Sequence, residues 1–247
     1  MNSQLLYGNM EPFILREDIA LNYIKKKKRR KRASLLSLIC SIAITVFIII
    51  AFCVIYVDRF TITVTESTSL FLTIDETREV VTTKLEAPPL KRANDMQYSE
   101  LPTNIDEGLG SKNTDTYFSY SFYLGCNEST NYSLNMTLKE SSNDLEEAIR
   151  IMIIRNGVRT IYAKAKEDGP QKEIFNGSDR SKPDEILGYA TPFKENSHII
   201  LEPYSIVSGD YDRYTVVMWI DGWESVNSMK GGTVQTDLKF STLSTIN

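Results

Sequence analysis

The most constraining feature of the sequence is a long apolar run that follows directly on a basic cluster. Residues 35–57 span 23 positions without a charged residue, a glycine or a proline. A helix needs about 20 apolar residues to cross the hydrocarbon core of a bilayer. A single isolated segment in lipid can satisfy its backbone hydrogen bonds only as a helix. The run therefore predicts one transmembrane α-helix over residues 35–57.

Eight consecutive basic residues precede this run, and they set its expected orientation. They are Lys25, Lys26, Lys27, Lys28, Arg29, Arg30, Lys31 and Arg32. Basic residues next to a span stay on the cytoplasmic side and are attracted to anionic headgroups of the lipid bilayer. A nuclear-localisation signal is the alternative interpretation, and direct contact with the span disfavours it. We expect a cytoplasmic basic segment at residues 1–34 and an extracellular domain at residues 58–247 of a single-pass cell-membrane protein.

A cleaved secretory signal is the alternative to a permanent anchor. The best match to a small-residue cleavage site is Ala51-Phe52-Cys53. This match to the A-x-A-like pattern is poor, and the apolar run is longer than the 7 to 15 residues of a usual signal. The sequence therefore favours an uncleaved signal-anchor.

The charges and cysteines limit what the exterior part can be. Residues 1–34 carry nine basic and three acidic residues, whereas the rest of the chain carries 19 basic and 29 acidic residues. This acidic balance excludes nucleic acid as an expected partner, because nucleic-acid binding requires clustered Lys and Arg. Cys40 and Cys53 lie in the predicted span and Cys126 stands alone outside it. No disulfide can form within the exterior part, so its folding must depend on burial.

Beyond the span, period-two alternation of apolar and polar residues predicts β-strands. They are expected at residues 60–65 (continued by 70–74), 117–124, 132–138, 148–155, 158–163, 198–201, 214–220 and 233–240. Residues 87–112 are rich in Pro, Gly, Asn and Asp and are predicted to form a linker-like loop, which either crosses over the domain or extends away from it. Residues 164–192 are expected to form a long surface excursion. A short helical turn is expected at residues 143–147.

Two turns are predicted to close hairpins. Asn156-Gly157 lies between two β-rich runs, which is the strongest short hairpin signal, since both residues must accept positive φ. Residues 125–131 are predicted to connect the strands on either side as a second hairpin. Short strands with frequent turns and no long amphipathic helix predict a mostly β, antiparallel β-sandwich of jelly-roll or Greek-key type, preceded by the transmembrane helix.

Several strand and turn segments together resemble a known group of proteins. These segments are residues 117–124, 144–157, 162–164, 212–222 and 231–234. The set resembles uncharacterised membrane-anchored or secreted surface proteins of Clostridia-type Gram-positive bacteria, and it is distantly similar to the TasA/camelysin group of matrix proteins. The resemblance implies a jelly-roll-like domain on the cell surface without a cofactor, some relatives polymerising by strand exchange.

The chain departs from that pattern in two places, so no functional residue is carried over. A full-length span replaces the usual cleavable signal. After Asp221-Gly222, the residues Trp223-Glu224-Ser225-Val226 replace an acidic, cysteine-containing loop.

No catalytic or metal-binding constellation is evident. His198 is the only histidine and lies beside the apolar residues 199–201, so it is interpreted as structural. Asp210, Asp212, Asp221 and Glu224 supply the oxygen atoms that calcium accepts, but their spacing is not that of an EF-hand loop. We therefore predict no cofactor, with calcium as the alternative, and interpret these acids as solvated turn residues.

Aromatic residues near residue 220 form the candidate binding surface. Exposed aromatic side chains often anchor sugars or protein partners. Trp223, Tyr211 and Tyr214 are the candidates. Trp219 shares a strand face with Val217 and is expected in the core.

The leading functional hypothesis is a non-enzymatic, membrane-anchored surface protein for structural or adhesive contact with a protein or cell-wall polymer. The alternative is a sensory domain that binds a ligand such as a carbohydrate. A cell-wall hydrolase is a lesser alternative, which would need convergent carboxylates in a groove. The sequence does not specify the oligomeric state.

Overall fold

The computed structural model describes residues 21–30, 37–45, 60–65, 69–90, 93–166, 171–176, 185–195 and 198–245. The chain divides into two compact units, Met1–Val57 and Asp58–Asn247. The boundary between them falls at the end of the predicted span. The second unit is called the β-rich unit below.

The first unit is described only in two helical segments, residues 21–30 and 37–45. Most of the predicted span 35–57, together with Lys31, Arg32 and Cys53, lies outside the described residues. None of the helices in the described ranges has the length and apolar character needed to cross a membrane. The structure therefore gives no support to the predicted transmembrane helix.

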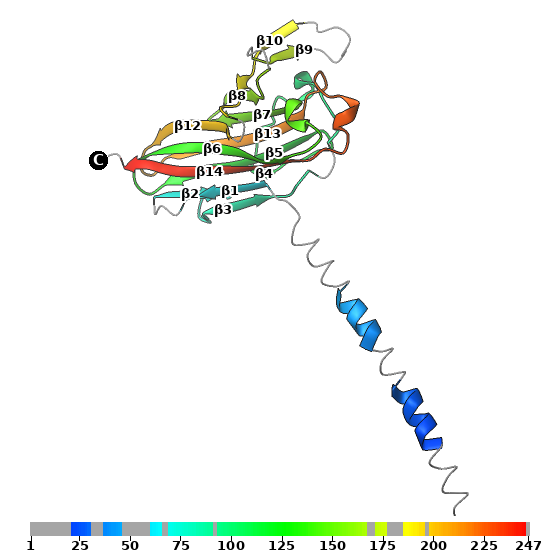
Figure 1. Cartoon of the computed structure of the whole chain (residues 1–247). Coiled ribbons are helices and arrows are strands. Elements are labelled where there is room, and N and C mark those ends of the chain that lie inside the picture. Colours follow the sequence, from blue (N-terminus) through cyan, green and yellow to red (C-terminus); the bar gives the residue numbers. More distant parts are fainter. Residues whose placement is uncertain are drawn as a thin grey trace, which may run out of the picture. The chain divides into compact units, whose positions relative to one another are not determined.

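The β-rich unit contains fourteen strands within the part of the chain that is described (Figure 1). They are β1 Phe60–Val64, β2 Leu70–Thr73, β3 Lys84–Ala87, β4 Gly110–Ser111, β5 Tyr117–Cys126, β6 Thr130–Ser141, β7 Ile149–Arg155, β8 Val158–Ala163, β9 Glu173–Asn176, β10 Glu185–Tyr189, β11 Thr191–Pro192, β12 His198–Ile206, β13 Tyr211–Ile220 and β14 Val234–Thr245. Three single-turn 3-10 helices join them: η1 Tyr98–Glu100, η2 Leu145–Glu147 and η3 Asn227–Met229. The predicted β-rich fold is confirmed.

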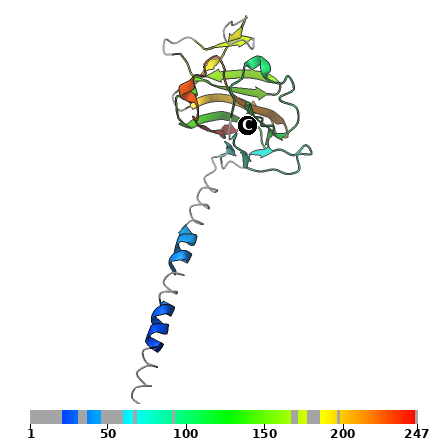
Figure 2. The ribbon, with the colours of Figure 1, turned by 90° about the vertical axis from the view of Figure 1, so that its right-hand side faces the viewer.

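The strands form two main sheets and one separate hairpin. The five-stranded sheet has the order β12-β6-β14-β1-β3, and the seven-stranded sheet has the order β11-β8-β7-β13-β5-β2 with β4 beside β5. The hairpin β9–β10 belongs to neither sheet and projects beyond them (Figures 1 and 2). Pairing is antiparallel except at β1–β14 and β8–β11, which are parallel. The predicted antiparallel arrangement therefore describes the remaining strand pairs and not these two.

One hydrophobic core lies between the two main sheets, and the alternation of the strands explains it. The predicted inward residues of β5 and β6 are in this core, with Phe122, Leu124 and Leu134 fully buried. Residues of β14 and β1 join them, including Phe240 and Ile62. Burial of such side chains stabilises the fold by about 1.5–3 kcal/mol each.

A second, smaller core covers the outer face of the seven-stranded sheet. It consists of Met96, Ile105, Met152, Ile154, Val217 and Trp219. Met96 and Ile105 belong to the predicted loop 87–112, so this part of the loop crosses over the sheet. This segment covers the outer face of β7 and β13 and the main core covers their inner face, so both strands are buried on two faces. Trp219 is in a core, as predicted.

The connection between β5 and β6 differs from the prediction. Residues 125–131 were expected to close a hairpin, but β5 pairs with β13, β2 and β4, whereas β6 pairs with β12 and β14. The connection therefore passes from one sheet to the other. In each of the two strands every second residue is apolar and points into the core. Alternation alone cannot distinguish two paired strands from two strands that face each other across a core. For the same reason β2 does not continue β1 but pairs with β5 in the other sheet.

The Asn156-Gly157 hairpin is confirmed. Strands β7 and β8 pair antiparallel around it, with Arg155 opposite Val158. Asn156 has φ 50° and Gly157 has φ 82°. Positive φ at both central residues matches the right-handed twist of the flanking strands.

Replacing Gly157 with alanine is expected to lower the free energy of unfolding by about 1–2 kcal/mol, the cost of left-handed backbone for a residue with a Cβ. Nothing lies within 4 Å of the position of that Cβ, so the loss would be conformational rather than steric. Gly188 on β10 also has open space around it and does not have a positive φ, so Gly188→Ala is the matched control. Urea denaturation of the full chain in detergent measures both variants. Equal effects of the two substitutions would contradict the interpretation.

Candidate binding site

A small pocket lies where one end of the seven-stranded sheet meets the crossing segment and the β9 strand. It is lined by Gln97, Tyr98, Arg150, Ile174, Phe175, Trp219, Asp221 and Trp223, which we call the aromatic pocket. Its empty space is about 210 Å³, including the part that is open to solvent, and only a small part of this space lies inside the protein. The inner space therefore accommodates about one water-sized group.

The pocket has a buried floor and an aromatic rim. Gln97, Arg150, Trp219 and Asp221 form the floor, and each is at most 7% exposed. The rim consists of Tyr98, Ile174, Phe175 and Trp223, which are half-buried. Two ring contacts define it: Tyr98 lies 6.2 Å from Trp219, and Phe175 lies 5.1 Å from Trp223, between ring centroids.

Sheet register and one bridge assemble this arrangement. Trp219 on β13 is the cross-strand partner of Arg150 on β7, so the two side chains are neighbours on one face. The Met96 N–H donates to the Ile220 carbonyl at 2.9 Å, and the Gly222 N–H donates to the Met96 carbonyl at 3.0 Å. These bonds hold the crossing segment against the end of β13 and place Gln97 and Tyr98 at the pocket.

A buried ion pair forms the base of the floor. The Arg150 guanidinium lies 2.9 Å from Asp221 and 3.7 Å from Glu224, and its Nη1 donates to the carbonyls of Glu147 and Ile149. Burial lowers the pKa of Arg150 although these carboxylates oppose the change. Burial likewise raises the pKa of Asp221 against the pull of Arg150. The Asp221 carboxylate also accepts a hydrogen bond from the backbone N–H of Trp223 at 3.0 Å. This bond fixes the start of the loop that carries Trp223.

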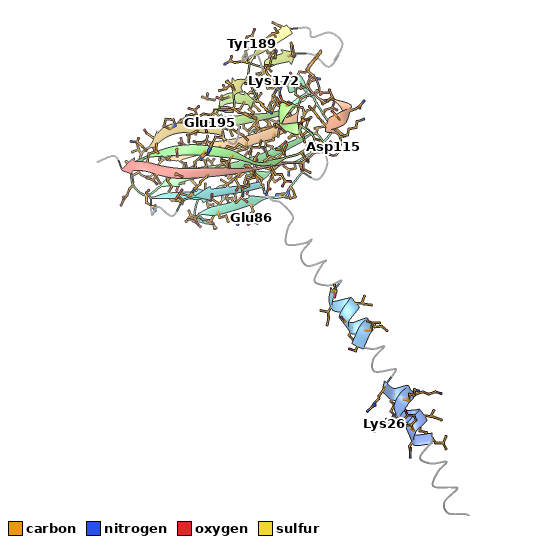
Figure 3. The ribbon with its side chains drawn as sticks, viewed as in Figure 1. Lys26, Glu86, Asp115, Lys172, Tyr189 and Glu195 are labelled. Carbon is orange, nitrogen blue, oxygen red and sulfur yellow. The ribbon has the colours of Figure 1, made fainter. Side chains whose placement is uncertain are left out.

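Lys172 connects the β9–β10 hairpin to the same charge network. It is 4% exposed, and its ammonium group donates to the Glu147 carbonyl at 2.6 Å and to the Glu147 carboxylate at 3.1 Å. Its Nζ also lies 3.6 Å from Glu224. Burial raises the pKa of Glu147, but hydrogen bonds from Lys164 and Lys172 outweigh it, so the pKa is lowered overall. Figure 3 shows Lys172 between the hairpin, where Tyr189 lies, and the main sheets. Lys172 thus holds Phe175 close to Trp223.

Several polar atoms of the pocket are buried without a hydrogen-bond partner among the described residues. They are the indole Nε1 atoms of Trp219 and Trp223, the Nε of Arg150, and both side-chain amide atoms of Gln97. Buried polar groups in folded proteins are nearly always paired, and those that are not call for an explanation such as a bound molecule. These N–H donors and the Gln97 amide therefore need a hydrogen-bond partner, and the space beside them admits about one water molecule.

The structure does not bring the predicted binding residues together. Trp223 lies at the rim of the aromatic pocket. Tyr214 is fully buried in the main core, so it cannot belong to an exposed surface. Tyr211 is at the opposite end of β13, where its ring packs 5.8 Å from Phe71 and under the guanidinium of Arg78 at 4.5 Å. Tyr211 begins the ten-residue strand β13, whereas Trp223 lies beyond the other end of that strand, in the turn after Ile220.

The sequence reasoning missed Gln97, Tyr98 and Phe175, which come from loop and excursion segments. These segments carry no periodic signal, so their position over the sheet was not predictable locally. Arg150 did carry a signal, because it is a charged residue within the apolar run of β7. A lone charge in a strand buried on both faces requires a buried partner.

The four acids interpreted as solvated turn residues lie in two separate places, and the interpretation is wrong for Asp212 and Asp221, which are buried and paired with arginines. Asp221 and Glu224 lie at the aromatic pocket, whereas Asp212 is near the other end of β13 and Asp210 is exposed. Among the residues that the structure describes, no three His, Cys, Asp or Glu side chains are grouped so that they could hold a metal ion. Calcium therefore gains no candidate site within the described ranges.

The remaining titratable candidates have ordinary structural partners. The His198 ring lies half-buried with Nδ1 3.2 Å from the Asn135 amide oxygen. The Cys126 thiol is buried and donates to the Val207 carbonyl at 3.1 Å, and burial raises its pKa. Neither side chain lines the aromatic pocket.

A second buried polar group, the Asp212 cluster, connects the two main sheets. It consists of Asp212, Tyr132, Tyr214, Arg155 and Asn156. The Tyr132 hydroxyl on β6 donates to the Asp212 carboxylate on β13, and the hydroxyls of Tyr132 and Tyr214 are 2.6 Å apart. The Asp212 carboxylate also accepts from Arg155 at 2.9 and 3.2 Å and from Asn156 at 2.6 Å. Burial raises the pKa of Tyr132 and of Tyr214, so both hydroxyls remain protonated donors. This cluster is satisfied internally and is a structural connection.

Comparison of the chain with protein-family models, with curated proteins and with solved structures gives no match. The resemblance to bacterial surface and matrix proteins therefore stays a prediction from the quoted segments.

Proposed function

We propose that this chain is a single-pass, membrane-anchored surface protein whose β-rich unit is a non-enzymatic binding module for adhesive contact. In this proposal residues 35–57 cross the membrane, residues 1–34 lie in the cytoplasm, and the β-rich unit is an extracellular β-sandwich of jelly-roll or Greek-key type. The aromatic pocket is the point of contact with a partner such as a cell-wall polymer.

The observation that carries the binding role is the aromatic pocket. Ligand sites combine aromatic walls with a few polar groups that fix orientation, and this pocket has three rim aromatics over a floor with unpartnered polar atoms. Asp221, the carboxyl group that lines it, is already held by Arg150. This engagement favours binding over catalysis, because a general acid or base needs a carboxyl that is free to exchange its proton with a substrate.

A sensory domain for a soluble ligand is the second candidate function. The observation that favours it is the small size of the pocket, which suits one small group better than a broad flat contact. The adhesive and the sensory function use the same binding site. They differ in that a sensory domain transmits ligand binding to the cytoplasmic segment, whereas an adhesive module does not.

The topology is tested by cysteine labelling of the full chain in intact cells. Glu195 and Tyr23 are both exposed, and Tyr23 lies in the first unit. A membrane-impermeant maleimide is expected to label Glu195→Cys without permeabilisation and Tyr23→Cys only after it. The unsubstituted chain is the control for the native thiols. The reverse pattern, or labelling of both positions in intact cells, would overturn the anchored orientation.

Adhesion is tested with cells that display the chain on surfaces coated with purified cell-wall polymer. Removing the rim aromatic in Trp223→Ala is expected to reduce attachment by about tenfold or more, since aromatic anchors dominate such contacts. Tyr189→Ala is the matched control, because Tyr189 is an aromatic residue on the neighbouring hairpin that is 59% exposed and lies outside the pocket. Equal attachment of cells with and without the chain would reject the adhesive role.

A further inference from the structure

The β9–β10 hairpin differs from the rest of the β-rich unit in how it is attached. It forms a two-stranded sheet of its own and projects beyond the two main sheets (Figures 1 and 2). The described side chains of both strands are half-buried or exposed, and Ile186, Leu187 and Tyr189 on β10 are at least 47% exposed. Burial therefore contributes little to holding these strands in place, and segments with few buried apolar contacts open at a low cost in free energy.

The two ends of the hairpin, in contrast, are buried and bonded. Lys172 precedes β9 and Ala190 follows β10, and they are 4% and 1% exposed. The Ala190 N–H donates to the Lys172 carbonyl at 2.9 Å, and the Lys172 ammonium group lies against Glu147 and Glu224. After Ala190 the chain enters β11, which pairs with β8 in the seven-stranded sheet. Lys172 and Ala190, which we call the root, therefore fix the hairpin at its base.

Beyond the root, the hairpin covers the aromatic pocket through a ring contact. The centroids of the Phe175 ring on β9 and the Trp223 ring are 5.1 Å apart, and Ile174 lines the pocket beside them. Aromatic rings at this separation are in contact, so no group can pass between them. We propose, on the basis of the proposed binding function, that the β9–β10 hairpin is a flap that turns about its root and uncovers the aromatic pocket by separating Phe175 from Trp223.

The small interior of the aromatic pocket is the reason that binding requires this opening. The interior admits about one water molecule, whereas a sugar residue of a wall polymer is several times larger. A partner therefore reaches the floor of the pocket only after Phe175 has moved away from Trp223. The apparent affinity is then reduced by the fraction of chains in which the flap is open. The ring contact thus restrains binding, and its removal is expected to strengthen binding.

Spin labels measure the opening without a ligand. One label is attached at Glu185→Cys on β10 and the other at Lys239→Cys on β14, because both side chains are exposed. Cys40 and Cys53 are replaced with serine, and Cys126 is buried and is not expected to react. Double electron–electron resonance on the full chain in detergent then gives the distances between the flap and the five-stranded sheet. A main closed distance and a minor open distance are expected.

Phe175→Ala removes the closing contact and leaves the root intact. It is expected to raise the ratio of open to closed flap about two- to tenfold, which is the strength of an aromatic pair expressed as a ratio. Tyr189→Ala is the matched control, because Tyr189 is an aromatic residue of the same hairpin that is 59% exposed and lies outside the pocket. Its distance distribution is expected to equal that of the unsubstituted chain.

The attachment assay relates the opening to binding. Cells that display Phe175→Ala are expected to attach to the coated wall polymer up to about tenfold more strongly than cells with the unsubstituted chain, because more of their pockets are open. A fixed pocket wall predicts the opposite, since the loss of a contact ring from a wall weakens attachment. Tyr189→Ala is expected to leave attachment unchanged.

The two measurements distinguish the flap from the proposed function. An unchanged distance distribution in Phe175→Ala would reject the flap and leave the adhesive module in place, and so would equal or weaker attachment of that variant. No attachment by the unsubstituted chain or by any variant would reject the adhesive function, and the distances would still decide whether the hairpin opens. A larger open fraction together with stronger attachment would support the flap.

Discussion

Replacing Asp212 with alanine is expected to lower the free energy of unfolding of the β-rich unit by about 3–5 kcal/mol, the usual cost of removing one partner of a buried charge pair. The side chain of Asp212 is 8% exposed and that of Arg155 is 27% exposed. Without the carboxylate, Arg155 keeps its charge with no carboxylate partner, and the Tyr132 hydroxyl loses the acceptor that connects the two sheets. Urea denaturation of the full chain in detergent, followed by tryptophan fluorescence, measures the loss.

Two comparisons make this prediction specific. Asp210 lies two residues earlier and is exposed, so Asp210→Ala is the matched control and is expected to change the free energy of unfolding by no more than about 0.5 kcal/mol. Tyr132→Phe removes one hydroxyl and is expected to cost about 1–2 kcal/mol, less than the loss of the carboxylate. A loss below about 1 kcal/mol for Asp212→Ala would show that the cluster contributes little to holding the sheets together.

The strands were predictable because their signal is local. Alternation along β5, β6 and β14 states which residues face a core, and the residues it selects, such as Phe122, Leu134 and Phe240, are buried. The continuous β formers of β13 predicted a central strand, and β13 lies between β7 and β5. The Asn156-Gly157 turn was predictable because positive φ is a property of the two residues themselves.

The pairing of the strands was not predictable in the same way. The inward residues of β5 and of β6 give the same alternating sequence pattern whether the two strands pair with each other or face each other across the core. The structure places them in different sheets, and the burial of Tyr132 against Tyr214 across the core depends on this crossing. Ser119 and Ser121 on the second face of β5 are also buried, although that face carries polar residues. Such burial comes from neighbours far along the chain.

The candidate site was only half accessible to sequence reasoning. Trp223 was identified because an aromatic residue after a strand end has no place in the alternating core. Trp219 was correctly assigned to a core. That this core lies on the outer face of the sheet and borders a pocket depends on residues 93–98, which cross the sheet at this point. Phe175 reaches the site from a hairpin outside both sheets. A site built from four segments has no sequence spacing to recognise.

Replacing Arg150 with methionine is expected to lower the free energy of unfolding by about 3–5 kcal/mol at neutral pH, because it leaves the Asp221 carboxylate buried without its cation. The Arg150 side chain is 1% exposed and that of Asp221 is 10% exposed. Asp221 already has a raised pKa from burial, and loss of Arg150 removes the group that lowers it. A carboxyl whose pKa is higher in the folded than in the unfolded state binds its proton more tightly when folded. The deficit of Arg150→Met should therefore shrink as the pH falls through that pKa.

The double variant Arg150→Met with Asp221→Asn separates the charge from the contacts around it. Asparagine keeps an acceptor for the Trp223 N–H and carries no charge, so the double variant is expected to recover about half or more of the loss and to show no such dependence on pH. Arg159→Met is the matched control, because Arg159 lies on the adjacent strand β8 with its side chain 36% exposed, and a change of no more than about 1 kcal/mol is expected there. If the double variant were as unstable as the sum of its single substitutions at every pH, the two residues would act independently, and the floor of the aromatic pocket would not rest on their ion pair.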